Sequence, residues 1–311
     1  MKIIRPVALL DAMLDSSNVS ETSPAANEWS NVTAYSIGDE VTVTYTGAGA
    51  SVATHLVYTC NFAHTGKDPT LAANRGTGNG WDITDATNRW RAFNNVLQLG
   101  ATNADTIEYE ITPGEGVNAA ALFGVDAQTV TIQLTDPVDG LVYDEDYSMI
   151  SPSGITDWWL YYTEEIVREE RLFVDDLPHY PDATLDIIVD DTGGTAEVGE
   201  IVFGKSFVIG DSQNGANFGI IDYSIKNTDD DGNTTIAQGA YADIADVNVI
   251  IQTSRFNEIH KTLKAYRSQP LVWVPADDYE QTIVYGYYRN FRNAITGPVV
   301  STTLLQLEGL T

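Results

Sequence analysis

The sequence predicts a mainly all-β protein with antiparallel sheets, and three observations favour this fold class. Short runs alternate between apolar and polar residues, as in VTVTYTG at 41–47, TIEYEI at 106–111 and TVTIQL at 129–134. Gly, Pro, Asn and Asp separate these runs at short intervals, and only one stretch has helical spacing. Alternating runs between turn residues are typical of strands that pack as sandwiches or barrels.

The order of these runs divides the 311 residues into four segments, since so long a chain exceeds one ordinary core. Residues 1–26 form an N-terminal arm, and residues 27–90 form a small module rich in aromatic residues. Residues 91–205 carry six or more strands, enough for a sandwich or jelly roll. Residues 206–311 carry strands on both sides of one helix, which predicts a β-barrel to which the N-terminal arm contributes.

The helix is predicted at about 254–267, within TSRFNEIHKTLKAYRSQP. Its apolar residues recur at helical spacing: Phe256, Ile259, Leu263 and Tyr266. Thr253 or Ser254 is the expected N-cap, and Pro270 prevents the helix from continuing.

The run WWLYY at 158–162 is predicted to be a strand of the middle segment. Alternation then gives two faces, one with Trp158, Leu160 and Tyr162 and one with Trp159 and Tyr161. One face must be core. The other would meet a sugar or a neighbouring subunit, and the subunit is favoured because protein interfaces are rich in Tyr and Trp.

The charge balance excludes several classes of partner. Lys and Arg number 16 against 44 Asp and Glu, a formal net charge of −28. Such a chain repels nucleic acid and anionic membranes, so neither stable nucleic-acid binding nor membrane insertion is expected. A salt-adapted surface explains the same charge.

No motif of an enzyme or a cofactor site occurs, and we therefore expect no cofactor and no enzymatic activity. The single Cys60 allows no intrachain disulfide, and the four histidines lack metal-ligand spacing. The start MKIIRPVALLDAML is interrupted by charged residues and Pro6, which does not fit a signal peptide. A soluble chain made in a cytoplasm is the expectation.

One weak calcium candidate lies in NTDDDGNTTIAQ at 227–238, where Asn227, Asp229 and Asp231 match early positions of a calcium loop. The twelfth position is Gln238, where a bidentate Glu is needed. An acidic turn is therefore the favoured interpretation, and no metal is expected.

The aromatic residues of segment 27–90 have two interpretations. Trp29, Tyr35, Tyr58, Phe62 and Trp81 alternate with turn residues such as Gly38-Asp39 and Thr65-Gly66. A small module often uses its aromatic residues as a core. Exposed rings would instead form a flat face for a pyranose, whose C–H bonds stack on the π cloud.

The same residues resemble the small chitin- and cellulose-binding modules attached to chitinases. Those modules have the order Trp, Tyr, Gly-Asp-x-Val, Tyr, Pro, Trp, which this segment follows from Trp29 to Trp81. Their aromatic pair after the second Tyr is replaced here by Asn61 and Phe62. The resemblance implies a carbohydrate-binding surface with Trp29, Tyr35, Phe62 and Trp81 as its candidate residues.

Two further resemblances cover the rest of the chain. Segment 91–205, from RWRAFNN to AEVGEIVFG, resembles a galactose-binding-type jelly roll. The two ends resemble tail-tip proteins of long-tailed bacteriophages, through RPVALLDAML at 5–14, FNEIHKTLKAYRSQPLVWVPADD at 256–278, VYGYYRNF at 284–291 and STTLLQLEGL at 301–310.

The second resemblance implies a tail-tube-like β-barrel with one flanking helix, in a distal-tail or hub-adjacent subunit of a baseplate ring. Six copies are favoured over three, with the tail tube, the hub and other tail-tip proteins as neighbours. The expected location is the virion tail tip, assembled in the host cytoplasm, where the small module would contact host surface glycans. The alternative is a polysaccharide-binding or glycan-degrading protein.

The charge suits a tail tip, because a negative channel wall lets DNA slide past. Six of the 16 bases cluster in the C-terminal part within fewer than 40 residues: Arg255, Lys261, Lys264, Arg267, Arg289 and Arg292. We expect them at subunit contacts, where they would reduce repulsion between acidic copies.

Overall fold

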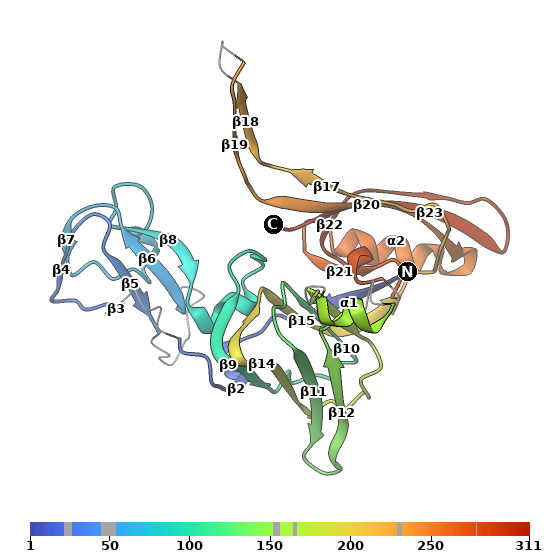
Figure 1. The fold of residues 1–311 in the computed structure, drawn as a ribbon, viewed down its shortest axis with the longest axis horizontal. Coiled ribbons are helices and arrows are strands. Elements are labelled where there is room, and N and C mark those ends of the chain that lie inside the picture. The colour runs from blue at the N-terminus through green and yellow to red at the C-terminus, as the bar shows by residue number, and fades with distance from the viewer. Residues whose placement is uncertain (22–26, 45–53, 152–155, 164–166, 229–231, 278) are drawn as a thin grey trace.

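The protein is built mainly of antiparallel β-strands, as the sequence predicts (Figure 1). The computed structural model describes residues 1–21, 27–44, 54–151, 156–163, 167–228, 232–277 and 279–311. Two large sheets form the body of the molecule. A small module, a helix and a long hairpin extend from it.

The larger sheet has ten strands and runs through the whole body. Its order is β13 (Arg171–Val174), β10 (Ala119–Phe123), β15 (Glu200–Val208), β1 (Lys2–Pro6), β21 (Leu271–Val274), β22 (Val284–Ala294), β23 (Val300–Gly309), β20 (Tyr241–Gln252) and β16 (Asp211–Ser212), with β17 (Asn217–Asp222) also paired to β20.

Most of this sheet curls into a closed barrel, because β15 and β16 act as one bent strand. β15 pairs with β1, while β16, which begins shortly after β15 ends, pairs with β20. The N-terminal ammonium of Met1 donates to the carbonyl of Gly210 at 2.8 Å, at the bend between them. A Cβ at Gly210 would lie 2.1 Å from the carbonyl oxygen of Ile250, so only glycine allows this approach. The barrel order is β15/β16, β1, β21, β22, β23 and β20.

The helix α2 (Phe256–Ala265) packs on the concave side of the barrel. Ile259 and Leu263 are buried in the same cluster as residues of the barrel strands, including Trp273. The predicted N-cap is wrong, since no side chain caps α2 and the short 3₁₀ helix η4 (Thr253–Arg255) precedes it. The Thr253 hydroxyl instead bonds Gly297 and Ser301.

The second sheet forms the sandwich. Its order is β12 (Gly140–Ser148), β11 (Thr129–Asp136), β14 (Thr184–Val198), β9 (Ala101–Ile111) and β2 (Leu14–Ser17). It faces strands β13, β10 and β15 of the larger sheet across one core. Alternate residues of β11 point into that core, namely Val130, Ile132 and Leu134.

Sandwich and barrel share strand β15, so the predicted boundary at 205 falls inside a strand. Ile201 and Phe203 face the sandwich core, whereas Phe207 packs on the barrel core. The N-terminal arm likewise supplies β1 to the barrel and β2 to the sandwich, with η1 (Asp11–Met13) between them.

The small module stands beside the sandwich, in blue and cyan in Figure 1. Its strands are β3 (Asn27–Glu28), β5 (Glu40–Val43), β6 (Leu56–Cys60) and β8 (Trp81–Ala86) in one sheet, and β4 (Ala34–Tyr35) paired with β7 (His64–Thr65). The module also contains the short 3₁₀ helix η2 (Ala72–Asn74), and the 3₁₀ helix η3 (Asn88–Phe93) leads from it into the sandwich. A further 3₁₀ helix, η5 (Glu280–Thr282), lies near the barrel.

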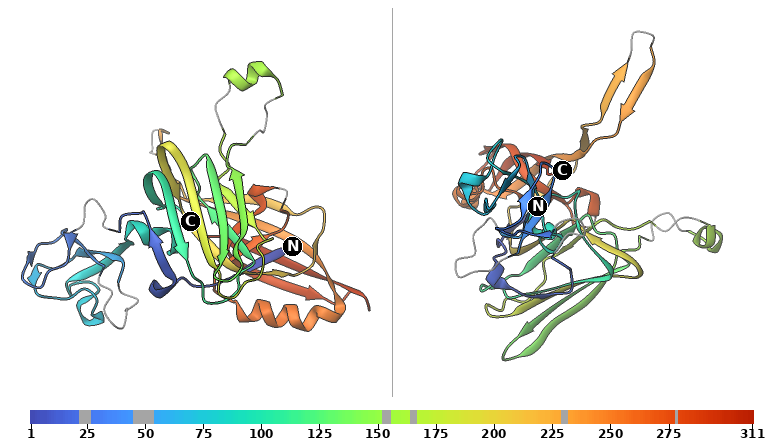
Figure 2. Two further views of the ribbon diagram at one scale, coloured as in Figure 1. Left: turned by 90° about the horizontal axis from the view of Figure 1, so that it is seen from below. Right: turned by 90° about the vertical axis from the view of Figure 1, so that its left-hand side faces the viewer.

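The predicted strand at 158–162 is wrong, because this run begins the helix α1 (Trp158–Thr163). The Asp157 side chain accepts the N–H groups of Trp159 and Leu160 and thereby starts a helical turn. The segment stands away from both sheets (Figure 2), and no strand among the described residues pairs with it. Trp158, Trp159 and Tyr162 are each at least 75% exposed, and none of them is core.

A hairpin of β18 (Ile225–Thr228) and β19 (Thr234–Ala237) extends from β17 and β20 far beyond the barrel (Figures 1 and 2). Every described residue of these two strands is exposed. Asn227 lies within β18 opposite Thr235, while its partners in the calcium prediction, Asp229 and Asp231, lie outside the described residues.

Candidate functional site: the junction between module and sandwich

Two of the four predicted carbohydrate-binding residues are core residues of the module. Trp81 has no exposed surface, and its Nε1 donates to the carbonyl of Lys67 at 2.8 Å. Tyr35, 7% exposed, meets the Trp81 ring edge-on at 5.0 Å. Neither ring can stack on a sugar, so these two assignments are corrected. The physical reason is the small size of the module, which uses its aromatic residues to build a core.

The other two predicted residues do not complete a flat face. Trp29 is half-buried against the same core. Phe62 is half exposed, and the Lys67 ammonium lies 5.2 Å from its ring centre. A single exposed ring, already covered in part by a cation, remains of the predicted platform.

The structure instead brings aromatic residues together at a groove where the module meets the sandwich. We call it the junction groove; its volume is about 640 Å³. It is lined by Leu9, Leu10, Asp11, Ala12, Thr54, His55, Leu56, Ala86, Trp90, Phe93 and Asn94. Three segments far apart in the sequence therefore form one surface. The lining is mainly apolar, with a few polar groups among the rings.

The local sequence places the rings through η3. Thr87 connects it to the module, since its N–H donates to the carbonyl of His55 at 2.9 Å. The N–H of Trp90 in turn donates to the carbonyl of Thr87 and forms the first turn of η3. Trp90 and Phe93, three residues apart, then project from one side of this turn with their centroids 6.4 Å apart.

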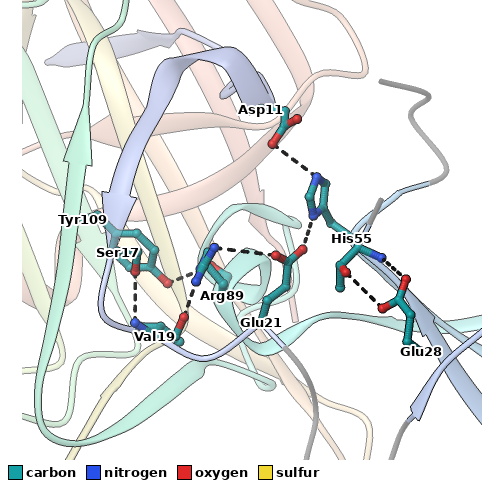
Figure 3. Close-up of polar contacts among 9 residues, drawn as sticks. Asp11, Ser17, Val19, Glu21, Glu28, His55, Arg89 and Tyr109 are labelled. Carbon is teal, nitrogen blue, oxygen red and sulfur yellow. Dashed lines mark hydrogen bonds and ion pairs between the residues drawn. The ribbon is translucent and has the colours of Figure 1, made fainter. Parts of the chain in front are cut away.

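His55 is the central polar residue of the junction groove (Figure 3). It is 8% exposed and has a φ of 62°, an unusual value for a residue with a Cβ. The backbone is held on both sides: the N–H of His55 donates to Val43, and its carbonyl accepts from Thr87. This conformation turns the imidazole away from the module sheet and onto Trp90, with ring centroids 4.6 Å apart.

Two carboxylates from the N-terminal arm flank the imidazole (Figure 3). Nδ1 contacts Glu21, and Nε2 lies 3.3 Å from Asp11. The imidazole therefore lies between two side chains of the N-terminal arm and joins the arm to the module.

Arg89 extends this network into the sandwich. It forms an ion pair with Glu21 at 3.5 Å, and its Nε donates to the carbonyl of Val19. The buried Tyr109 of β9 donates its hydroxyl to the carbonyl of Arg89 at 2.7 Å. The module, the arm and the sandwich are therefore joined by one set of polar contacts (Figure 3).

The chemistry of the junction groove is that of a binding site. It offers aromatic rings, aliphatic walls and a few polar groups such as Asp11 and Asn94, an arrangement that suits a ligand with an apolar face and a polar rim. The sequence signal was the spacing of Trp90 and Phe93 in RWRAFNN, but nothing in it reveals that residues 9–12 and 54–56 meet these rings.

The C-terminal bases lie mostly on the surface of the barrel. Lys261, Lys264 and Arg267 are exposed on or beside α2. Arg255 pairs with Glu258, and Arg289 pairs with Glu308.

In the described part of the chain, no three His, Cys, Asp or Glu side chains gather into a set that could bind a metal ion. Neither α1 nor α2, the α-helices within the described residues, has the length and apolar composition needed to cross a bilayer.

Comparison with known proteins gives little. No protein-family model and no curated protein matches the chain. Solved structures similar to part of it include chitosan-binding module 1 from a chitosanase/glucanase of Paenibacillus sp. IK-5 and a selenomethionine-labelled mutant of that module. Each match has 12% identity and a TM-score of 0.25, and covers 37% of this chain and 83% or 82% of the module. A likeness this slight carries no conclusion about function.

Proposed function

We propose that the chain is a structural subunit of a phage tail tip, which forms part of a ring through its barrel. The observation that carries the proposal is the closed barrel with α2 on its concave side, joined to the sandwich through the shared strand β15. This is the architecture that the resemblance of the two chain ends implies. A barrel bonded to its neighbouring domain through one continuous strand also suits a load-bearing part.

In this proposal the barrels of six copies surround the tail axis, between the tail tube and the hub. The exposed bases Lys261, Lys264 and Arg267 lie at contacts with acidic neighbours. The net charge of −28 keeps DNA from binding to the channel. The subunit is not an enzyme, and it reaches the virion tail tip by assembly in the host cytoplasm.

A second function, binding of a surface glycan, is supported by the junction groove. Trp90 and Phe93 give it aromatic walls, and its volume of about 640 Å³ accepts a short oligosaccharide. In a tail tip this groove would contact the host surface. In a protein of another kind it would serve polysaccharide binding alone.

The first proposal is tested by quantitative mass spectrometry of purified particles from a culture that makes the chain. About six copies per particle would support a ring, whereas absence from the particles would refute the tail-tip function.

The second proposal is tested by affinity electrophoresis in gels that contain soluble polysaccharides. Trp90→Ala should remove a retardation that Phe62→Ala leaves in place. Retardation that persists in Trp90→Ala, with its fold checked by circular dichroism, would rule out the junction groove.

A further inference from the structure

A second groove lies on the barrel side of the N-terminal arm, and we call it the Glu200 groove. Its volume is about 390 Å³. It is lined by Pro6, Val7, Ala8, Leu9, Phe93, Asn95, Glu200, Ile201, Val202, Phe203, Gln269, Pro270 and Tyr285. Leu9 and Phe93 also line the junction groove, so the two grooves adjoin. The walls are mostly aliphatic and aromatic.

A buried carboxyl group lies in this groove. Glu200, at the start of β15, is 3% exposed. Its Oε2 accepts the N–H of Asn95 at 2.8 Å, and its Oε1 lies 3.5 Å from the hydroxyl of Tyr285. Burial raises the pKa of Glu200 to about 8, although the hydrogen bond from the N–H of Asn95 acts to lower it. The carboxyl is therefore mostly protonated at neutral pH.

The Glu200 carboxyl is positioned by a hydrogen bond, but no cation of the described residues pairs with it. Among the described residues Glu200 forms no ion pair, and of the residues that line the groove only Glu200 and Tyr285 titrate. Asn95 has a φ of 62°, which directs its N–H to Glu200 while its side chain accepts the hydroxyl of Tyr285. Phe123 stacks on Tyr285 from the other side, with centroids 5.4 Å apart. Asn95 and Phe123 thus hold Glu200 and Tyr285 in place, and no Lys or Arg is among the residues that line the groove.

We propose that the Glu200 groove binds the side chain of a lysine presented by a partner protein, with the ammonium on Glu200 and the methylene stem along Phe93 and Pro270. A lysine stem buries well on apolar surface while its head seeks a carboxylate. The groove offers both, apolar walls and a buried carboxyl group. Charge complementarity supports this occupant, since the chain has 44 acids and only 16 bases.

The proposal predicts coupling between binding and protonation. An ammonium pairs with the carboxylate form, so binding must displace the proton that Glu200 carries at neutral pH. Affinity should then rise about tenfold per pH unit up to a pH of about 8 and become level above it. The bound ligand should in turn lower the pKa of Glu200.

The experiment uses Nα-acetyl-lysine N-methylamide as the probe and its Nε-acetylated form as the matched neutral control. Calorimetry on the full chain at pH 8 should detect the probe and not the control, with affinity at least tenfold weaker at pH 6. Glu200→Gln should abolish binding, whereas Glu108→Gln, an exposed carboxyl on β9, should leave it unchanged. Equal binding of the acetylated control, no binding at pH 8, or unchanged binding by Glu200→Gln would overturn the proposal.

A second measurement keeps the test decisive if Glu200→Gln folds poorly. Carboxyl ¹³C resonances of the native chain report the titration of Glu200 directly. Saturating probe should move its midpoint to lower pH by at least one unit. A midpoint that does not move would refute the lysine site.

Discussion

The imidazole of His55 stacks on the indole of Trp90, with ring centroids 4.6 Å and ring planes 24° apart. This contact joins the small module to the 3₁₀ helix that enters the sandwich. Since Glu21 and Asp11 flank the same imidazole, one residue connects the module, the N-terminal arm and the sandwich. We therefore expect His55 to fix the position of the module on the body.

His55→Ala should loosen the junction. The substitution removes the ring stack and leaves the mostly buried Glu21 carboxylate without its imidazole partner. The loss of this partner should cost about 1–3 kcal/mol in folding free energy. Limited proteolysis should then separate the module from the body faster than in the native chain. His260→Ala, at an exposed position on α2, is the control. Equal cleavage rates in both variants would show that His55 does not fix the junction.

Trp81→Ala should unfold the module. Removing this fully buried side chain should lower the free energy of unfolding by about 3–5 kcal/mol, and a module of this size is only marginally stable. Phe62→Ala should change stability by less than about 1 kcal/mol, because half of that ring is already exposed. Thermal melts followed by tryptophan fluorescence compare the two. Similar melts would mean that Trp81 is not the core residue described above.

Stability should fall as pH rises, through Glu200. Its pKa is raised from 4.5 to about 8 in the folded chain, so between these values the folded state binds more protons than the unfolded state. The free energy of unfolding then falls by at most about 1.4 kcal/mol per pH unit in this window, and the contribution is constant above it.

Glu200→Gln should remove this pH dependence of stability, because an amide does not titrate. The fold should be kept, since the amide oxygen can still accept the N–H of Asn95. Urea unfolding at pH 5 and pH 8 measures the effect. The variant should resemble the native chain at pH 5 and exceed its stability at pH 8. A variant less stable than the native chain at pH 8 would contradict a buried Glu200 carboxyl with a raised pKa.

Arg171→Ala should weaken the contact between the sandwich and the barrel. Arg171, 9% exposed on β13, donates to the carbonyl of Ile283 at 2.7 Å and pairs with Asp243 of β20 at 2.5 Å. Removing one partner of such a pair costs up to about 3–5 kcal/mol. Arg168→Ala, in a more exposed pair with Asp126 and Asp191, should cost less. Chemical denaturation measures the free energy of unfolding of both variants. A larger decrease in Arg168→Ala than in Arg171→Ala would contradict the prediction.

Charge reversal on α2 should block assembly without unfolding the chain. Lys261→Glu with Lys264→Glu changes only exposed residues, so the melting temperature should move little. Acidic neighbours would then repel the barrel, and incorporation into particles should drop at least tenfold. Lys226→Glu, on the exposed hairpin, is the control. Normal incorporation of the α2 variant would exclude these bases from the subunit contacts.

The sequence predicted elements whose periodicity matches their burial. Along β11 each second residue is buried, from Val130 to Leu134, as alternation requires. Ile259 and Leu263 indicated the buried face of α2, which lies within the predicted range of about 254–267. These features are local, so a single stretch of sequence contains them.

The remaining features depend on contacts between distant segments. The run from Trp158 to Tyr162 has strand composition, but no strand in the described part of the chain pairs with it, and a helix capped by Asp157 forms instead. The aromatic pattern of the small module predicted exposed rings, whereas Trp81 is buried in the core of the module. Residues 9–12, 54–56 and 86–94 meet only in three dimensions, so the spacing of Trp90 and Phe93 alone could not reveal the junction groove.

Electron cryomicroscopy of assembled particles tests the tail-tip function most directly. We predict density for the barrel in six copies around the tail axis, with Lys261, Lys264 and Arg267 at contacts between copies and a net negative or neutral channel wall. A single copy off the axis, a channel lined by these bases, or particles without the chain would contradict the tail-tip function.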